Sequence, residues 1–207
     1  MNDQEVLKIL EDSQAILSGH FVYTSDRHGT GYVNKDALYL HTEITSLLCR
    51  EIAKRFLSDD VETVVGPAMG GIILSQWLAH HLQDISKRKI FAVYAEQTQE
   101  GFGFKRGYDE YVRNRRVLVV EDILNTGRSA TQCVQGVRDV GGIVVGLGVL
   151  CNRGSVTSVQ AGNPPRLEAL TNLKMISWEE HECPLCKAGE PVNTAIGHGA
   201  TFLARQK

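Results

Sequence analysis

Hydrophobic and polar positions alternate along the middle of the chain with two different periods. Short apolar runs rich in valine and isoleucine are typical of buried strands, and apolar residues that recur every three or four positions are typical of helices. Strands are expected at residues 62–66, 89–95, 116–121 and 143–150, and helices from residue 42, at 71–82 and at 128–140. This alternation predicts an α/β fold with a doubly wound, mostly parallel sheet.

The N-terminal pattern is less regular. Asn2 and Glu5 have the spacing of a capping box, and the apolar positions after them predict a helix that continues to a stop at Gly19. Short strands are expected at 20–24 and 31–39. After residue 150 the pattern weakens, and only an edge strand near residues 173–178 is expected.

Composition limits the possible classes of protein. The 207 residues are 43% hydrophobic and carry a net charge of -2, which fits one domain and argues against a broad nucleic-acid surface. No apolar run approaches the roughly 20 residues of a membrane span, and the first residues lack the basic start of a secretory signal. Five cysteines without a repeated spacing favour free thiols in the cytoplasm.

The segment 117–129 carries the clearest chemistry. An apolar run ends in Glu121 and Asp122, and a loop of small and hydroxyl residues leads into the helix expected from residue 128. Backbone N–H groups at such a helix start bind phosphate, and the carboxylates behind them suit hydroxyls or a phosphate-bound metal. A buried strand that merely ends in charged residues is the simpler alternative, but it leaves the loop unexplained.

This segment resembles the signature with which type I phosphoribosyltransferases bind phosphoribosyl pyrophosphate (PRPP). The resemblance implies that Glu121 and Asp122 hold the ribose 2′- and 3′-hydroxyls. It implies that the 5′-phosphate is cradled by the loop residues Asn125, Thr126, Gly127, Arg128 and Ser129. It also implies Mg²⁺ as a cofactor that is held mainly through PRPP, with no direct protein ligand.

Two further loops resemble parts of the same family. Residues 64–71 are similar to its pyrophosphate-binding loop, with Ala68, Met69, Gly70 and Gly71 as the expected contacts. Many orotate phosphoribosyltransferases have a lysine where Gly70 stands.

The segment 96–108 resembles the mobile catalytic loop of orotate phosphoribosyltransferases, which closes over a neighbouring subunit. Lys105 and Arg106 would then neutralise the departing pyrophosphate, and with Asp122 they are the expected catalytic residues of a homodimer. A solvated β-hairpin with surface charge is the alternative for this loop.

The base is expected to meet Arg153, because a guanidinium binds a carboxylate such as that of orotate through two hydrogen bonds. Tyr32, Val33, Asn34 and Lys35 fall where family members line the base pocket, and the first three are the expected base contacts. The resemblance thus implies a single domain over 1–207, with a PRPP-binding core at about 42–154. A small hood would form from about 18–40 and the C-terminal segment.

The predicted activity is the orotate phosphoribosyltransferase reaction, with PRPP and orotate as partners and neither nucleic acid nor membrane. A phosphoribosyltransferase for a purine base and a PRPP-sensing regulator are the alternatives. Cys183 and Cys186 form a single CxxC pair, with His181 and His198 nearby in sequence. Because zinc needs four ligands and no second pair is present at an ordered spacing, structural or free thiols are expected.

Overall fold

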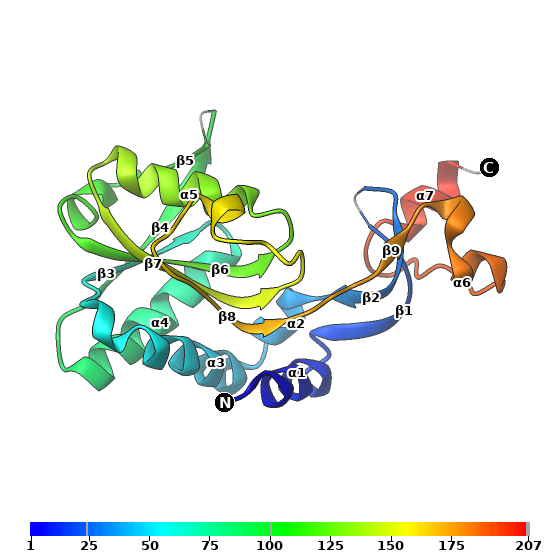
Figure 1. The fold of residues 1–207 in the computed structure, drawn as a ribbon, viewed down its shortest axis with the longest axis horizontal. Helices are drawn as coiled ribbons and strands as arrows, with labels where there is room; N and C mark the ends of the chain where they lie inside the picture. Colours follow the sequence, from blue (N-terminus) through cyan, green and yellow to red (C-terminus); the bar gives the residue numbers. More distant parts are fainter. Residues whose placement is uncertain (24, 100, 206–207) are drawn as a thin grey trace.

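The computed structural model describes residues 1–23, 25–99 and 101–205 and is built around a twisted sheet (Figure 1). Within these residues the sheet has six strands in the order β5-β4-β3-β6-β7-β8, and all neighbours are parallel except β4 and β5. The strands are β3 (Thr63–Pro67), β4 (Phe91–Thr98), β5 (Gly101–Gly103), β6 (Arg116–Leu124), β7 (Ile143–Asn152) and β8 (Leu167–Asn172). The predicted α/β fold with a mostly parallel sheet is confirmed.

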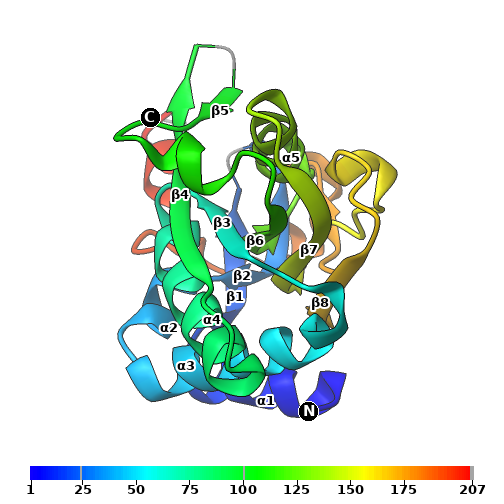
Figure 2. The same cartoon turned by 90° about the vertical axis from the view of Figure 1, so that its left-hand side faces the viewer.

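Helices bury both faces of this sheet (Figure 2). On one face α3 (Thr42–Arg55) and α4 (Gly70–Ser86) pack against alternate strand residues such as Leu118 and Val120. On the other face α5 (Arg128–Asp139) packs against Val117 and Val119. Because successive strand residues point to opposite faces, the apolar run of β6 has to be continuous, as the sequence has it.

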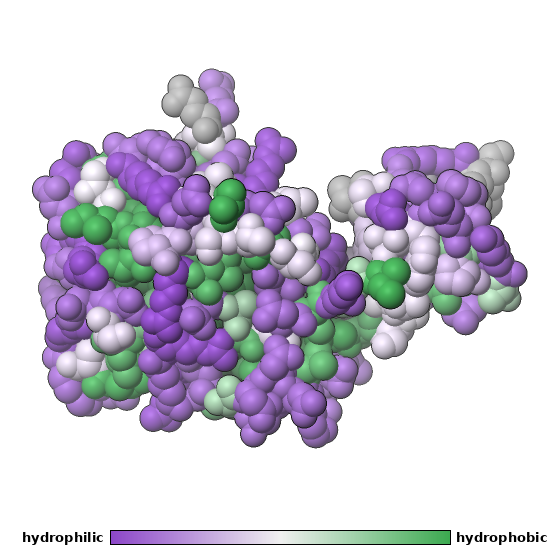
Figure 3. Space-filling view, viewed as in Figure 1, coloured by the Kyte–Doolittle hydropathy of each residue, from purple (hydrophilic) through white to green (hydrophobic). Residues whose placement is uncertain are grey.

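A second, smaller sheet forms the hood, which extends away from the larger part (Figure 1). Its strands β1 (Ile16–Val22), β2 (His28–Val33) and β9 (Ser177–Trp178) are antiparallel in the order β1-β2-β9. The C-terminal helices α6 (Pro184–Lys187) and α7 (Gly199–Arg205) lie against these strands. The surface narrows between the hood and the larger part (Figure 3).

The remaining elements are short. They are α1 (Asp3–Asp12), α2 (Lys35–Tyr39) and the 3₁₀ turns η1 (Leu57–Asp59), η2 (Tyr108–Tyr111), η3 (Val159–Ala161) and η4 (Glu180–Glu182). Among the described residues, no helix combines the length and apolar character that crossing a membrane requires.

The N-terminal helix is shorter than its apolar pattern predicted. The capping box of Asn2 and Glu5 is present, but α1 ends at Asp12, and Gln14 adopts a left-handed φ of 57°. A left-handed residue breaks the helical path, so Ile16 and Leu17 belong to β1 instead. Apolar β-branched residues suit a strand as well as a helix, which is why this boundary was misplaced.

Other boundaries also differ from the expectation. The strand predicted over 31–39 stops at Val33 and is followed by α2. The loop predicted after Ala95 contains the β4–β5 hairpin, so the hairpin alternative describes its backbone. The strand predicted over 116–121 continues to Leu124, which places the acidic pair inside β6. Thr24 and Glu100, parts of an expected strand and loop, lie outside the described residues.

Candidate active site

Glu121 and Asp122 lie in β6 and point to opposite faces of the sheet, as neighbouring strand residues do. Glu121 lies on the α5 side, as Val117 and Val119 do at alternate positions of β6, and Asp122 faces α2 and the start of α4. Both are almost completely buried, with relative exposures of 6% and 5%. The two carboxyl groups therefore have different partners, although they are adjacent in sequence.

Asp122 has a cation and a hydroxyl beside it. The ammonium group of Lys35 lies 2.8 Å from Asp122 Oδ2, and the Tyr39 hydroxyl donates to the same oxygen at 3.2 Å. Burial lowers the pKa of Lys35, but the Asp122 carboxylate, its hydrogen bond to Lys35 and smaller contributions from Asp36 and Glu121 together raise the pKa above its ordinary value. Burial and this carboxylate both raise the pKa of Tyr39, so the site holds an ammonium–carboxylate pair and a neutral phenol.

Among the described residues, no cation is paired with Glu121 as Lys35 is with Asp122. Burial, reinforced by the neighbouring Asp122 charge, raises the pKa of Glu121 to about 8. Its Oε1 accepts a hydrogen bond from the Asp122 backbone N–H at 3.1 Å. At neutral pH this carboxyl group is therefore largely protonated and is able to donate a hydrogen bond as well as accept one.

The loop after β6 leads directly into the N-terminus of α5. Gly127 stands at the N-cap with φ 79°, and the helix has no side-chain cap within the described residues. The Arg128 N–H donates to Thr126 Oγ1 at 3.4 Å. Within the described residues, the N–H groups that follow it in the first turn of α5 remain available to an anion, which a helix start attracts through its dipole. Ser129 lies inside the helix, so the alternative in which it serves only as the cap does not describe this helix start.

The loop between β3 and α4 is tightly closed. A Cβ atom on Gly66 would lie 2.1 Å from the Gly71 carbonyl oxygen, so the turn requires glycine. Gly70 faces the acidic strand, because a Cβ atom there would lie 1.9 Å from Asp122 Oδ2 and 2.9 Å from Lys35 Nζ. Met69 is 82% exposed at the tip of this turn, next to Ala68.

The Lys35 ammonium therefore lies next to the position that the Cβ atom of a lysine at position 70 would occupy. Sequence reasoning placed Lys35 among the base-pocket positions and missed this contact. No local signal predicts it, since the ion pair joins residues that are 87 positions apart, 35 and 122.

A cavity of about 590 Å³ lies between the hood and the carboxyl ends of the core strands. From the core it is lined by Asn125, Thr126 and Arg153, and from the hood by residues that include Tyr23 and Tyr32. A smaller adjoining cavity is lined by residues that include Tyr32, Val33, Asn34, Lys35, Asp122, Asn125 and Arg153. Of the residues expected to bind PRPP, Asp122, Asn125 and Thr126 therefore share these cavities with the residues expected to bind the base. The others, which are Glu121, Gly127, Arg128, Ser129 and the turn 68–71, line neither cavity.

Arg153 connects the two groups. Its guanidinium donates to Asn125 Oδ1 at 3.0 Å and lies over the Tyr23 ring at 4.9 Å from the ring centroid. The backbone N–H groups of Arg153 and Gly154 both donate to the Leu124 carbonyl at 2.9 Å. These bonds hold the turn after β7 against the loop after β6.

Lys105 and Arg106 lie elsewhere. Both pair with Glu96 on β4, at 3.0 Å and 3.3 Å, and both are exposed. Neither is among the described residues that line the two cavities. Within one chain, the expected catalytic cations are therefore not at the expected binding site.

Comparison with known proteins identifies the family. Residues 37–181 match the phosphoribosyl transferase domain. An orotate phosphoribosyltransferase of Pelotomaculum thermopropionicum is 39% identical over 191 residues, which are 92% of this chain and 95% of the relative. One of Desulforamulus reducens is 35% identical over 191 residues, again covering 92% and 95%.

Solved structures agree in fold. A Mycobacterium tuberculosis orotate phosphoribosyltransferase superposes with a TM-score of 0.66 at 24% identity, covering 82% of this chain and 97% of that chain. The enzyme from Aeropyrum pernix superposes with a TM-score of 0.60 at 22% identity, covering 89% and 99%. By its matched domain and its relatives, the chain belongs to the phosphoribosyltransferases, in the orotate phosphoribosyltransferase family.

Proposed function

We propose that this protein transfers the phosphoribosyl group of PRPP to orotate, which gives orotidine 5′-monophosphate and pyrophosphate in pyrimidine biosynthesis. One observation carries the proposal: Asn125 and Thr126, in the loop that leads into α5, line one cavity with Arg153, and the Arg153 guanidinium donates a hydrogen bond to Asn125. A sugar phosphate and a carboxylate-bearing base need such a pair of anion sites next to each other.

The 5′-phosphate would bind at the start of α5. Its donors would be N–H groups in the first turn of the helix, the backbone of the loop from Asn125 to Arg128, and the Thr126 and Ser129 hydroxyls. Glu121 and Asp122 would accept hydrogen bonds from the ribose hydroxyls. Since the two carboxyls face opposite sides of β6, this role requires the ribose to sit over the end of the strand, where both can be reached.

The pyrophosphate would lie against the turn from Ala68 to Gly71. This turn has no lysine of its own, and the Lys35 ammonium beside Gly70 supplies the positive charge instead. When PRPP binds, its pyrophosphate would lie on one side of the Lys35 ammonium and the Asp122 carboxylate on the other. Lys35 then pairs with a substrate phosphate as well as a protein carboxylate.

Magnesium fits this site as a partner of PRPP. The donor set facing Gly70 contains one carboxylate, Asp122, which already has Lys35 as a counterion. That set is too small to enclose Mg²⁺ but suits an ion that keeps its waters and binds mainly through substrate phosphates. When bound, Mg²⁺ would neutralise charge on the leaving pyrophosphate, and Asp122 would orient its water ligands or the ribose hydroxyls.

The base would lie in the cavity beneath the hood. Arg153 would bind the orotate carboxylate through two parallel hydrogen bonds, and Tyr32, Val33 and Asn34 would form the facing wall. Departure of pyrophosphate leaves positive, oxocarbenium-like character on the ribose. The chain has to position the two substrates and neutralise the leaving group, and no covalent nucleophile is required.

Lys105 and Arg106 would act on the site of a second subunit. They do not line the cavities of their own chain, and they are exposed beside the β4–β5 hairpin. A homodimer in which this segment crosses the interface would complete each site. The reaction would take place in the cytoplasm, in keeping with five cysteines that form no disulfide.

The test is the loss of orotate absorbance in the presence of the purified protein, PRPP and Mg²⁺. Omission of PRPP or Mg²⁺ should abolish the change, and adenine, guanine or hypoxanthine should not replace orotate. Turnover of a purine base with no turnover of orotate would reassign the substrate. PRPP binding without turnover of any base would instead indicate a regulator.

A further inference from the structure

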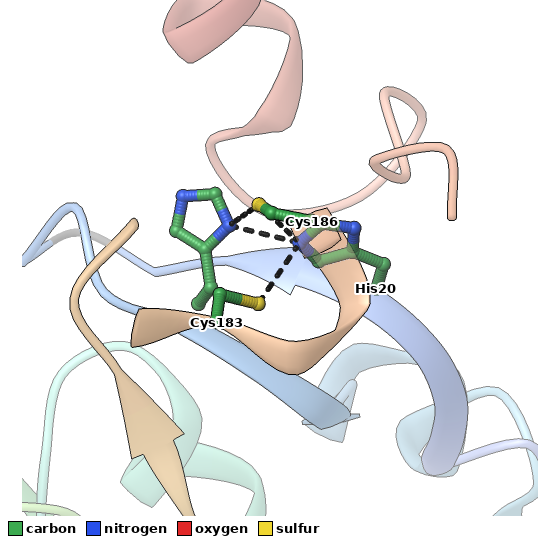
Figure 4. Close-up of side chains that lie close together, drawn as sticks. His20, Cys183 and Cys186 are labelled. Atoms are coloured by element: carbon green, nitrogen blue, oxygen red, sulfur yellow. Dashed lines mark hydrogen bonds between the residues drawn. The ribbon is translucent and has the colours of Figure 1, made fainter. Parts of the chain in front are cut away.

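We infer that the hood contains a zinc site formed by His20, His28, Cys183 and Cys186. The four side chains come from β1, β2 and the start of α6, and their candidate ligand atoms all lie within 4.8 Å of one another. His20 and both cysteines point toward a common centre (Figure 4). The CxxC pair thus obtains its two missing partners from the other end of the chain.

The distances suit a tetrahedral ion. Zinc–nitrogen and zinc–sulfur bonds place neighbouring ligand atoms about 3.3–3.8 Å apart in a tetrahedron. Both thiol sulfurs lie 3.7 Å from His20 Nε2, and Cys186 Sγ lies 3.3 Å from His28 Nδ1. The two histidine nitrogens are closer, at 2.8 Å, and would separate slightly around an ion.

The protonation of His20 also suits a ligand. Its Nδ1 lies 2.8 Å from the Glu190 carbonyl oxygen, which can only accept, so Nδ1 carries the proton and Nε2 presents a lone pair to the cluster. Metal-bound histidines commonly donate their second N–H to a carbonyl in this way, which fixes the ring.

The burial and charge of the group favour zinc over solvated thiols. His20, His28 and Cys183 are at most 3% exposed, and the His28 ring packs edge-on against Phe202. A hydrogen bond between the two histidines accounts for one contact but not for two thiols converging on the same nitrogens. Two thiolates neutralise Zn²⁺, so the completed site is uncharged and can be buried.

The site would attach the C-terminal segment to the hood. Strand β9 pairs with β2 at only two positions, His28 with Trp178 and Gly29 with Ser177. Ser177 also accepts hydrogen bonds from Arg27 and, with it, lines the cavity. An ion at this point would therefore hold the outer wall of the cavity in place.

The first test is the metal content of the full-length protein, produced without a histidine tag or chelator and measured by plasma mass spectrometry. We expect about one zinc per chain, because one four-ligand site binds one ion. Cys183→Ala and Cys186→Ala should each lower the zinc content per chain at least tenfold. Cys133→Ala, which removes a buried thiol on α5 outside the cluster, should leave it unchanged.

The second test uses cobalt as a spectroscopic probe, and its first measurement, on the wild-type protein, does not depend on any variant folding. Metal-free wild-type protein loaded with Co²⁺ should show thiolate-to-cobalt charge transfer and intense tetrahedral bands. His20→Cys should keep a metal, because a Cys₃His site also binds zinc, whereas His20→Ala should lose it.

A folded wild-type protein that takes up neither zinc nor cobalt would overturn the inference. So would iron in place of zinc, or zinc that remains in both cysteine variants. None of these measurements uses PRPP or orotate, so their outcome is independent of the proposed reaction.

Discussion

Two adjacent carboxyl groups in β6 have different properties because their surroundings differ. Asp122 has the Lys35 ammonium at 2.8 Å, whereas burial raises the pKa of Glu121 to about 8. Environment, more than residue type, decides which of two neighbouring acids is ionised at neutral pH. For a ribose with two hydroxyls to bind, one ionised and one protonated acid offer different hydrogen-bonding partners.

The raised pKa of Glu121 predicts a pH-dependent stability. Its folded state retains a proton that the unfolded chain releases above the ordinary glutamate pKa, so Glu121 costs stability as pH rises toward 8. Glu121→Gln should therefore raise the free energy of unfolding at about pH 9 by roughly 1–3 kcal/mol, since one pKa unit is worth about 1.4 kcal/mol. Near pH 5 the effect should be small.

Urea denaturation of the free protein at both pH values measures this difference. Glu11→Gln, at an exposed position of α1, should change stability equally at both. A Glu121→Gln effect that does not depend on pH would show that the carboxyl titrates normally.

The position of Lys35 predicts a role in PRPP binding. Lys35→Met removes the charge beside Gly70 but keeps most of the side-chain volume. Affinity for PRPP should fall about tenfold or more, because a charge-assisted contact is worth about 1.5–3 kcal/mol. Calorimetric titration with PRPP measures it, and Lys35→Arg should recover part of the loss.

Lys54→Met is the matched control, because Lys54 pairs with Glu51 on α3 and not with the acidic strand. Unchanged PRPP affinity in Lys35→Met, with full activity, would assign Lys35 a purely structural part as the counterion of Asp122.

At the scale of elements, the α5 start shows how a glycine can be required by two separate constraints. Gly127 has φ 79°, and a Cβ atom there would lie 2.3 Å from the Gln160 carbonyl oxygen. The first constraint is local, and the second comes from the η3 segment packed against the helix. Both keep the loop packed against η3 at the start of α5.

Gly127→Ala should therefore lower the free energy of unfolding by more than the strain of its left-handed backbone alone accounts for. Gly107→Ala is the matched control, since Gly107 has φ 75° and no atom within 4 Å of the added Cβ. The control should cost about 1 kcal/mol, and Gly127→Ala should cost roughly 2–4 kcal/mol and weaken phosphate binding. Thermal unfolding measures both, and equal losses would show that η3 simply moves away.

The elements that sequence predicted well are those whose signals are local. The capping box of Asn2 and Glu5 lies within one turn, and the valine-rich run of β6 can only be a strand buried on both faces. Elements with ambiguous signals were misplaced. Residues 35–39 continue the apolar pattern of β2, but they form a helical turn that brings Lys35 to Asp122.

At the scale of the whole molecule, the contacts that sequence did not predict join distant segments. His20 meets Cys183 across 163 positions, and nothing near either residue indicates the other. The loop proposed to bind phosphate could be recognised in the sequence because its residues lie within one segment of nine, 121–129. The wall proposed to face the base could be recognised only in part, because it combines residues of the hood strands with Lys174, Met175, Ser177 and His198 from the C-terminal segment.

Whether one chain alone holds a complete active site is a question for the whole molecule. Lys105 and Arg106 pair with Glu96 and line neither cavity, whereas Arg153 lines both. If the loop acts on the neighbouring subunit, a mixed dimer of Lys105→Ala and Arg153→Ala chains contains one site with an intact loop and an intact pocket. Separately, each variant should turn over orotate at a small fraction of the wild-type rate.

After unfolding and refolding together in equal amounts, the mixture should recover about a quarter of wild-type activity, because half of the dimers are mixed and each has one intact site. The control replaces the second chain with Lys105→Ala/Arg153→Ala, which supplies no intact loop, and the mixture should then stay inactive. A chain that completes its own site gives no recovery in either mixture. That result would place Lys105 over the cavity of its own subunit and would require the segment after β5 to fold back toward the hood.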